Sequence, residues 1–267
     1  MDSEKEFEQQ ELDNPDFDDI YSDDSEEDGP SGRSFLFRLT ALFTVLAFIG
    51  LVAITSLPGL NVPIFELVSE SLHHKKDIDE QLLQAVVKIN VVSRKKGSSL
   101  AVEQKSGTGF NISPGGLIVT NHHVVDDALN IAVSFPDGKM YSAARWTGKP
   151  EYDLALITLN KANLPTVPLN TSSPPVSGDH VRIVGNPLGL NNIIVAGEVK
   201  QYLTMKDQKV FSIDAQIYPG NSGSPVYDKS GKVVGVVFGS LRKGDDSNVN
   251  LGLAVPIADI LRLKNNY

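Results

Sequence analysis

The sequence predicts an all-β domain made of two barrels, preceded by a hydrophobic helix and an acidic tail. From Ala85 onward, short runs rich in β-branched residues alternate with turns that contain glycine, proline and aspartate. Many short strands separated by such turns are typical of barrels and sandwiches. Residues 164–178, rich in proline, serine and threonine, divide the strands into two groups. We therefore expect two barrels joined by a connector.

The first 30 residues differ in composition from the rest of the chain. They contain 14 acidic side chains and one lysine, a local charge of −13, against −9 for all 267 residues. A segment with so few apolar groups cannot bury enough surface to offset its loss of conformational entropy on ordering. We expect residues 1–34 to form a disordered acidic tail, which serves either as a solvating segment or as a docking site for a partner.

A hydrophobic run follows the tail. Residues 39–60 include no charged side chain, and about 20 apolar residues span the hydrocarbon core of a bilayer. A cleaved signal peptide would have a short basic leader, whereas this leader is long and acidic. We expect one transmembrane helix at residues 35–60, followed by a juxtamembrane connector at residues 61–80.

The expected strands occupy the remainder of the chain. Turn signals such as those at residues 114–116 and 229–231 separate them. The strands are residues 86–92, 117–120, 130–134, 154–159, 180–184, 193–199, 210–213, 233–238 and 251–255.

Bulk composition excludes several classes of function. No dense stripe of lysine and arginine with aromatic residues is present, so we expect no binding of nucleic acid. The chain has no cysteine, so packing alone must hold the domain together. His73, His74 and His180 lack companions at ligand spacing, and we expect no metal site and no cofactor.

Three short blocks carry the chemistry. They are Thr-Asn-His-His-Val at residues 120–124, Tyr-Asp-Leu-Ala-Leu at residues 152–156 and Gly-Asn-Ser-Gly-Ser-Pro at residues 220–225. A serine between glycines on a tight turn exposes a nucleophile, while nearby backbone N–H groups converge on an oxyanion. The order His, Asp, Ser is that of the chymotrypsin class. The first two blocks lie in the first strand group and the third lies in the second. We therefore expect the site in the cleft between the barrels.

With these blocks the sequence resembles the trypsin-like serine proteases, specifically their Deg/HtrA branch, from about residue 84 to about residue 263. The resemblance implies a chymotrypsin-like double six-stranded β-barrel, within a protease domain at residues 81–267. It implies a triad of His123, Asp153 and Ser222, with His123 as general base, Asp153 as its orienting partner and Ser222 as nucleophile. The backbone N–H groups of Gly220 and Ser222 would form the oxyanion hole.

The same resemblance indicates where the specificity pocket lies. Its walls should include Gln216 and the segment Val237, Phe238 and Gly239. No acidic residue stands at the position that would attract lysine or arginine. We therefore expect cleavage after small or medium apolar side chains.

The chain departs from the usual pattern of its relatives at three points. Ser224 stands where the family usually has glycine, so the turn must fit one extra hydroxymethyl group. Asn221 replaces the aspartate that pairs with a new N-terminus in digestive relatives, so we expect activity without N-terminal cleavage. The family usually carries a PDZ module after the protease domain, whereas this sequence stops at Tyr267, so we expect no activation through such a module in cis.

The resemblance predicts a membrane-anchored serine endopeptidase that cleaves unfolded or damaged proteins and, as in many relatives, forms a trimer. Anchored relatives usually face outward, which predicts a single-pass protein of the bacterial inner membrane with a cytoplasmic N-terminus and the protease domain on the periplasmic or extracellular side. An alternative is a catalytically weak pseudoprotease whose cleft holds peptides as a scaffold or chaperone. A third hypothesis makes the acidic tail the principal function, as an anchor for a cytosolic partner.

Overall fold

The computed structural model describes residues 32–56, 64–95, 97, 101–205, 207–242 and 250–264. The chain divides into two compact units, Met1–Val62 and Pro63–Tyr267. The predicted acidic tail lies outside the described residues as far as residue 31. Its last three residues belong to a helix instead, so the tail ends earlier than the sequence predicts.

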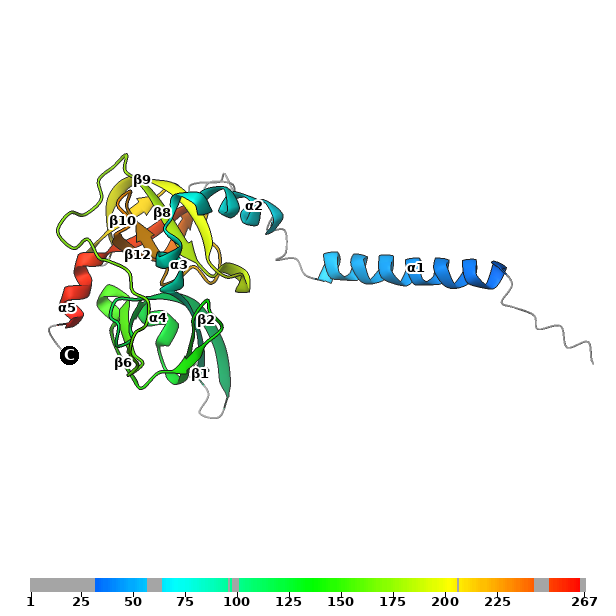
Figure 1. The fold of residues 1–267 in the computed structure, drawn as a ribbon, viewed down its shortest axis with the longest axis horizontal. Coiled ribbons are helices and arrows are strands. Elements are labelled where there is room, and N and C mark those ends of the chain that lie inside the picture. Colours follow the sequence, from blue (N-terminus) through cyan, green and yellow to red (C-terminus); the bar gives the residue numbers. More distant parts are fainter. Residues whose placement is uncertain are drawn as a thin grey trace, which may run out of the picture. The chain divides into compact units, whose positions relative to one another are not determined.

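The described part of the first unit is one helix, α1 (Gly32–Ser56) (Figure 1). It covers most of the predicted segment at residues 35–60, and threonine hydroxyls bond back to the preceding turn, as Thr44 Oγ1 does to the Thr40 carbonyl at 2.6 Å. Among the described residues, no helix combines the length and the hydrophobicity needed to cross a bilayer. The helix itself is therefore present, whereas its predicted membrane-spanning character lacks structural support.

Much of the predicted juxtamembrane connector is helical and folds onto the second unit. It contains α2 (Ile64–His74) and η1 (Lys75–Asp77), and α3 (Glu80–Gln84) follows. Leu67 and Ser71, one turn apart on α2, are buried. Ser71 Oγ accepts a hydrogen bond from the Ile194 N–H at 2.9 Å, so α2 packs against a strand of the second barrel.

The first barrel is a seven-stranded antiparallel sheet in the order β5-β4-β1-β2-β3-β7-β6. Its end strands are joined by only two residues, Ala143 and Ala144, whose N–H groups donate to the carbonyls of Ile131 on β4 and Thr158 on β7. One bent segment therefore links both ends of the sheet. The predicted count of six strands is wrong because this bend splits one strand into two. The strands are β1 (Val86–Arg94), β2 (Val102–Asn111), β3 (Leu117–Thr120), β4 (Ala128–Ser134), β5 (Met140–Ser142), β6 (Arg145–Lys149) and β7 (Leu154–Thr158).

The second barrel is closed and has six strands, the predicted count, in the order β10-β13-β12-β11-β8-β9. Phe211 fills its interior, and a side chain at Gly235 would overlap the Phe211 ring. Glycine at this position lets the ring occupy the centre of the barrel. The strands are β8 (His180–Gly185), β9 (Ile193–Met205), β10 (Gln208–Ile213), β11 (Pro225–Tyr227), β12 (Val233–Arg242) and β13 (Asn250–Pro256).

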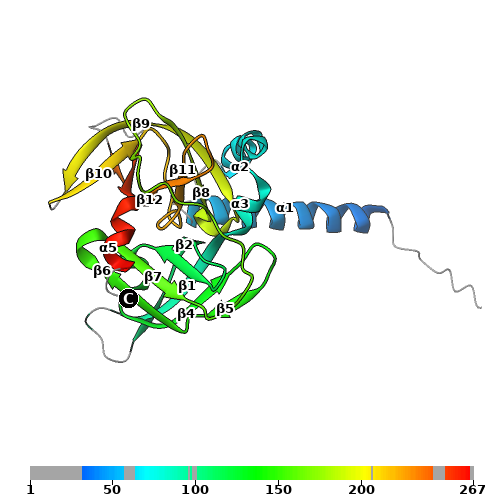
Figure 2. The same cartoon turned by 60° about the vertical axis from the view of Figure 1, so that its left-hand side comes forward.

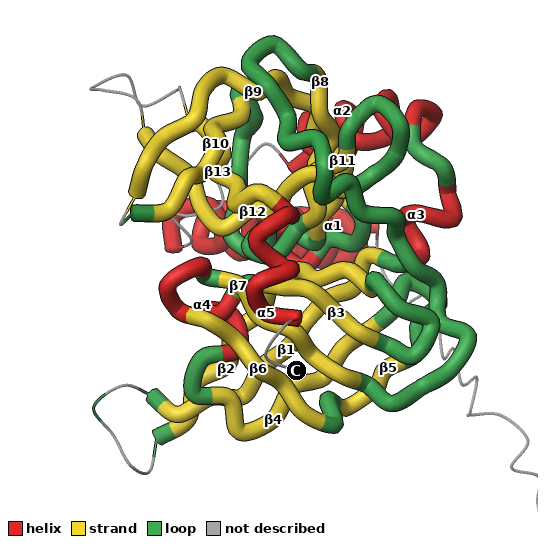
Figure 3. The backbone as a smooth tube through the Cα atoms, turned by 90° about the vertical axis from the view of Figure 1, so that its left-hand side faces the viewer, coloured by secondary structure: helices red, strands yellow, loops and turns green. Residues whose placement is uncertain are grey.

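The two barrels lie side by side, and a shared apolar cluster joins them (Figures 1 and 2). Phe110 and Leu156 enter this cluster from the first barrel, and Val184 and Val236 enter it from the second. The chain ends with η4 (Ile257–Ile260) and α5 (Leu261–Lys264), and α5 lies across the junction of the barrels in Figure 3. A continuous core at the junction fixes how loops of the two barrels face each other.

Candidate active site

Asp153 and His123 form a close pair on the first barrel. His123 belongs to the short helix α4 (His122–Val125), and Asp153 follows η2 (Pro150–Tyr152). His123 Nδ1 lies 2.7 Å from Asp153 Oδ2, and the His123 N–H donates to Asp153 Oδ1 at 2.9 Å. The side chains are 47% and 26% exposed, respectively, so the imidazole is accessible to a substrate.

The backbone of Asp153 adopts an unusual conformation that its neighbours stabilise. Its φ of 46° lies in the left-handed region, which costs a residue with a side chain about 1–2 kcal/mol. The Asp153 carbonyl accepts hydrogen bonds from Asn121 Nδ2 at 2.9 Å and from the His122 N–H at 3.2 Å. Together with the two bonds to the carboxylate, residues 121–123 hold both the backbone and the side chain of Asp153.

His122 has a different environment from His123. Its ring packs edge-on against Trp146 on β6, with ring centroids 6.0 Å apart. A side chain at Gly148 would come within 2.6 Å of the His122 ring. The His122 ring thus packs against β6, and His123 is the histidine whose ring contacts the Asp153 carboxylate.

Ser222 lies on a tight turn in which two glycines have left-handed backbones. Gly220 has a φ of 98° and Gly223 a φ of 86°. A Cβ atom at Gly223 would overlap the Thr108 carbonyl of β2, so this glycine is required by close approach as well as by conformation.

The N–H groups of this turn divide into two sets. The N–H groups of Asn221, Gly223 and Ser224 donate to backbone carbonyls at 2.8–3.0 Å. Within the described part of the chain, those of Gly220 and Ser222 have no acceptor. Two unbonded N–H donors on either side of Asn221, beside a serine hydroxyl, can stabilise a developing oxyanion.

Strand β2 contacts both the turn that carries Ser222 and the helix that carries His123. The Thr108 N–H donates to the Ser222 carbonyl at 2.8 Å. A Cβ atom at Gly107 would lie 2.9 Å from the Val124 side chain and 3.1 Å from the Ser222 carbonyl. Val124 directly follows His123 in α4. Gly107 therefore lies between the nucleophile turn and the histidine helix, and both segments pack against β2.

Ser224 fits into the turn without displacing it. Its side chain is fully buried, and Gly185 on β8 provides the space, because a Cβ atom there would overlap both Ser224 Oγ and Asn221 Oδ1. Ser224 keeps both backbone bonds, donating to Asn221 and accepting from Val237. The backbone hydrogen bonds of the turn are therefore made with Ser224 in place, whereas Ser224 Oγ is buried and has no hydrogen-bond partner among the described residues.

The predicted specificity residues lie in several environments. Gln216 is exposed and accepts a hydrogen bond from the Tyr218 hydroxyl at 2.6 Å. The Val237 side chain is buried in the core of the second barrel, whereas its backbone bonds to the nucleophile turn. Phe238 is half-buried, and a side chain at Gly239 would meet open space. Their role in specificity remains a prediction.

Sequence reasoning missed two polar residues that support the site. Asn121 binds the Asp153 carbonyl, and Thr108 binds both the nucleophile turn and the Asn186 N–H. Asn121 lies inside the first motif block, so that motif contained a signal, whereas Thr108 lies outside the three blocks. Their hydrogen-bond partners lie 32, 112 and 78 residues away in sequence, so the sequence alone could not predict these contacts.

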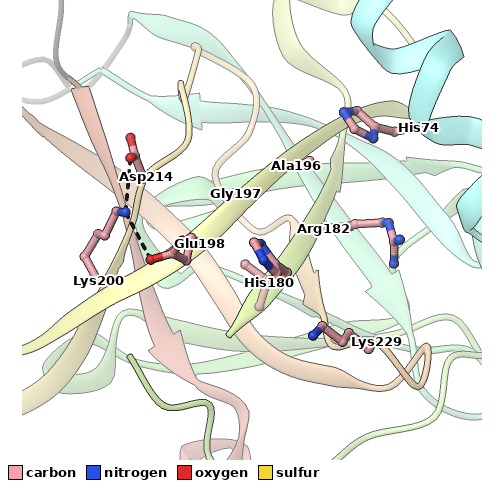
Figure 4. A pocket seen from close by; sticks show the side chains of 10 residues that line it. His74, His180, Arg182, Ala196, Gly197, Glu198, Lys200, Asp214 and Lys229 are labelled. Atoms are coloured by element: carbon pink, nitrogen blue, oxygen red, sulfur yellow. Dashed lines mark hydrogen bonds and ion pairs between the residues drawn. The ribbon is translucent and has the colours of Figure 1, made fainter. Parts of the chain in front are cut away.

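A cavity of about 600 Å³ lies away from these residues, against α2, β8 and β9 (Figure 4). Lys200 there pairs with Glu198 at 3.1 Å and Asp214 at 3.4 Å. The hydrogen bond that Lys200 donates to Glu198 is the main cause that raises the pKa of Lys200. His74 and His180 also line this cavity, and among the described residues no cluster of His, Asp or Glu could hold a metal ion.

Comparison with known proteins gives one family and a set of relatives. Residues 107–236 match the model of the trypsin-like peptidase domain. A probable periplasmic serine endoprotease, DegP-like, of Chlamydia pneumoniae is 37% identical over 159 residues, covering 58% of this chain and 32% of that protein. The serine endoprotease DegS of Escherichia coli is 30% identical over 233 residues, covering 83% of this chain and 66% of that protein. The chain thus spans about a third of the first curated relative.

Solved structures agree with this assignment. The crystal structure of the serine endoprotease from Yersinia pestis superposes with a TM-score of 0.60 and 27% identity, over 72% of this chain and 65% of that chain. The likeness supports the chymotrypsin-like two-barrel architecture and a serine endopeptidase. Residues 107–236 therefore match the trypsin-like peptidase domain, and the chain is similar to serine endoproteases of the DegP, DegS and HtrA type.

Proposed function

We propose that the chain is a serine endopeptidase that hydrolyses polypeptides through an acyl-enzyme on Ser222. The observation that carries this proposal is the turn at residues 220–224, where the two N–H groups without acceptors flank Asn221. The close pair of His123 and Asp153 supplies a base and its orienting carboxylate. Nucleophile, base and oxyanion donors are the minimum set for acyl transfer by this mechanism.

The reaction follows from these groups. Ser222 Oγ attacks the substrate carbonyl carbon while His123 Nε2 takes the hydroxyl proton, and Asp153 stabilises the imidazolium through Nδ1–H. The oxyanion accepts hydrogen bonds from the N–H groups of Gly220 and Ser222. The carbon–nitrogen bond then breaks, and His123 gives its proton to the leaving amine. Water then attacks the ester carbonyl while His123 takes its proton. The bond from the acyl carbon to Ser222 Oγ breaks, His123 returns the proton to Oγ, and the carboxylic acid product leaves.

For substrates we propose unfolded or damaged proteins, cut after small or medium apolar residues. The resemblance to the Deg/HtrA branch supports the substrate class, and the uncharged Gln216 supports the preference. Profiling with a peptide library checks the preference for small or medium apolar residues before the cut. A profile dominated by cleavage after lysine or arginine would contradict it.

We propose that residues 35–60 anchor the protein in the bacterial inner membrane, with the acidic tail cytoplasmic and the peptidase domain periplasmic. The uncharged run in the sequence supports the anchor, and a relative described as periplasmic supports the compartment. Recovery of the full-length protein in the soluble fraction after cell lysis, rather than in the membrane fraction, would refute the anchor.

We also propose that the domain forms a homo-oligomer, a trimer by analogy with its relatives, through α2. Phe65 is 86% exposed and Leu72 is 61% exposed, on the side of the helix away from buried Leu67. Exposed apolar side chains of this size often mark interfaces between proteins. Light scattering on wild type and on a Phe65→Ser/Leu72→Ser variant tests this, because the variant should become monomeric.

Turnover of a denatured protein by the full-length chain tests the proposed function. Wild type should degrade the substrate, and Ser222→Ala should lose on the order of 10⁶-fold in kcat, as in related triads. If wild type binds the denatured protein without cleaving it, and Ser222→Ala binds equally well, the alternative of a peptide-binding scaffold holds instead.

A further inference from the structure

Thr108 on β2 uses all of its polar atoms at the junction of the two barrels. The side chain is fully buried. Its hydroxyl donates to the Gly220 carbonyl at 2.7 Å and accepts from the Asn186 N–H at 2.9 Å. Its own N–H donates to the Ser222 carbonyl at 2.8 Å, and its carbonyl accepts from Thr120 Oγ1 at 2.8 Å. Thr108 thus binds the carbonyls of Gly220 and Ser222, the two residues of the turn whose N–H groups have no acceptor among the described residues.

The four carbonyls of residues 219–222 each accept a hydrogen bond. Thr108 provides two of these bonds, one comes from within the turn, and the Leu188 N–H provides the last, to Pro219 at 2.9 Å. Because a peptide group is planar, a bonded carbonyl also fixes the direction of the N–H in the same plane. The bond from the Leu188 N–H to the Pro219 carbonyl therefore aims the Gly220 N–H, and the bond from the Ser224 N–H to the Asn221 carbonyl aims the Ser222 N–H.

Gly220 depends on such bonds more than other residues do. It has a φ of 98° and no side chain, so sterics alone restrict its flanking peptide planes weakly. Thr108 Oγ1 holds the plane that follows Gly220. Leu188 holds the plane that precedes it, and Leu188 lies in η3 (Pro187–Gly189), directly after Asn186. The Thr108 hydroxyl thus holds Gly220 directly and, through the Asn186 N–H, the segment that holds Gly220 from the other side.

We propose that the Thr108 hydroxyl is a positioning group for the oxyanion hole, which aligns the Gly220 N–H with the oxyanion that forms on the substrate. This inference rests on the proposed function. Thr108 itself is buried and acts through Gly220 and Asn186. Because the Gly220 N–H binds more strongly to the oxyanion than to the ground-state carbonyl, loss of its alignment lowers kcat and leaves KM nearly unchanged.

Substitutions that preserve or remove the hydroxyl test the proposal in the full-length protein. Thr108→Val keeps the shape but leaves the Gly220 carbonyl and the Asn186 N–H without a partner. Removing an oxyanion donor costs about 10²–10³ in kcat, so misaligning one is expected to cost about tenfold. Thr108→Ser keeps the hydroxyl and should stay within about twofold of wild type. Thr108→Cys, with a weaker donor, should fall between them.

A transition-state analogue separates this role from a purely structural one. A peptidyl boronic acid forms a tetrahedral anionic adduct with a reactive serine, whereas a product peptide binds without one. Thr108→Val should weaken boronate inhibition by about the same factor as kcat and leave inhibition by the product peptide unchanged. Rates are expressed per folded molecule, measured by circular dichroism.

Ser212→Ala is the matched control, because it removes another fully buried hydroxyl, which bonds to the Gln201 carbonyl at 3.2 Å. Its kcat should stay within about twofold of wild type. An equal loss in Ser212→Ala, or a wild-type kcat in Thr108→Val, overturns the proposal. If Thr108→Val does not fold, equal kcat in Thr108→Cys and Thr108→Ser overturns it instead. Absence of turnover in wild type would refute the proposed function, and this inference with it.

Discussion

The first barrel holds His123 and Asp153 mainly through bonds to side chains, whereas the second barrel holds Ser222 on a turn whose backbone groups bond mostly to neighbouring segments. The histidine and the aspartate are partly exposed, and Asp153 is fixed by bonds from residues 121–123. The turn is built on glycines at positive φ and is packed against β2. Altered side chains should therefore impair chemistry in the first barrel, and added side chains should impair the fold in the second.

Asp153→Asn gives the sharpest test of the first half of this comparison. The amide can occupy the same place but cannot hold the imidazole in the required tautomer. We expect kcat to fall by about 10⁴-fold, with an unfolding midpoint close to that of wild type. Steady-state kinetics and thermal denaturation measure the two quantities. A variant that unfolds but retains its rate per folded molecule would reverse the assignment of roles.

Gly223→Ala tests the second half. The new Cβ atom would overlap the Thr108 carbonyl at a φ of 86°, so we expect the free energy of unfolding to fall by about 3 kcal/mol. Gly138→Ala is the matched control, since Gly138 has a φ of 85° and open space around it. It should lose only about 1 kcal/mol, the cost of the left-handed conformation. Equal losses in urea denaturation would show that overlap with β2 is unimportant.

Asn121→Ala removes one of the two hydrogen bonds to the Asp153 carbonyl. The left-handed backbone of Asp153 then has less support, and the carboxylate is held less firmly against His123. We expect kcat to fall by about tenfold and the free energy of unfolding by about 1 kcal/mol, a typical value for a hydrogen bond. A kcat equal to that of wild type would mean that the carboxylate bonds alone suffice.

Asp228, in the turn between β11 and β12, should affect stability and not chemistry. Partial burial acts to raise the pKa of Asp228, but hydrogen bonds from Ser230, Lys232 and Asn170 outweigh it and hold the pKa below its ordinary value. The stabilisation is therefore present above pH 4, roughly the unfolded pKa, and is lost as the pH falls through the lower folded pKa. Asp228→Asn should lose about 0.5–1 kcal/mol at pH 7 and almost nothing near pH 2, with kcat unchanged. A loss independent of pH would contradict the role of the charge.

The sequence allowed the nine predicted strands to be located, because each is a run of β-branched and apolar residues between turn signals. It did not reveal β2, whose residues include Glu103, Gln104 and Lys105 before two glycines. That strand is stabilised by pairing with β1 and β3 on either side, a tertiary effect that outweighs local propensity. The helix α2 was missed because its buried face includes Ser71, whose partner lies 123 residues away on β9.

The motifs identified the candidate triad but not the groups that hold it. A catalytic role can be read from residue type and order, since only a few side chains perform acyl transfer. The supporting bonds from Asn121 and Thr108, and the space that Gly185 leaves for Ser224, depend on contacts across the barrels. Such contacts appear only once the strands are in register.

The central claim is that Ser222 is an activated nucleophile within a formed oxyanion hole. Treating the full-length protein with a fluorophosphonate probe, followed by intact-mass analysis, tests this most directly. We expect one adduct per chain in wild type, located on Ser222 by peptide mapping, and none in Ser222→Ala. A folded wild-type protein that remains unlabelled, or labelling that persists in Ser222→Ala, would contradict the claim.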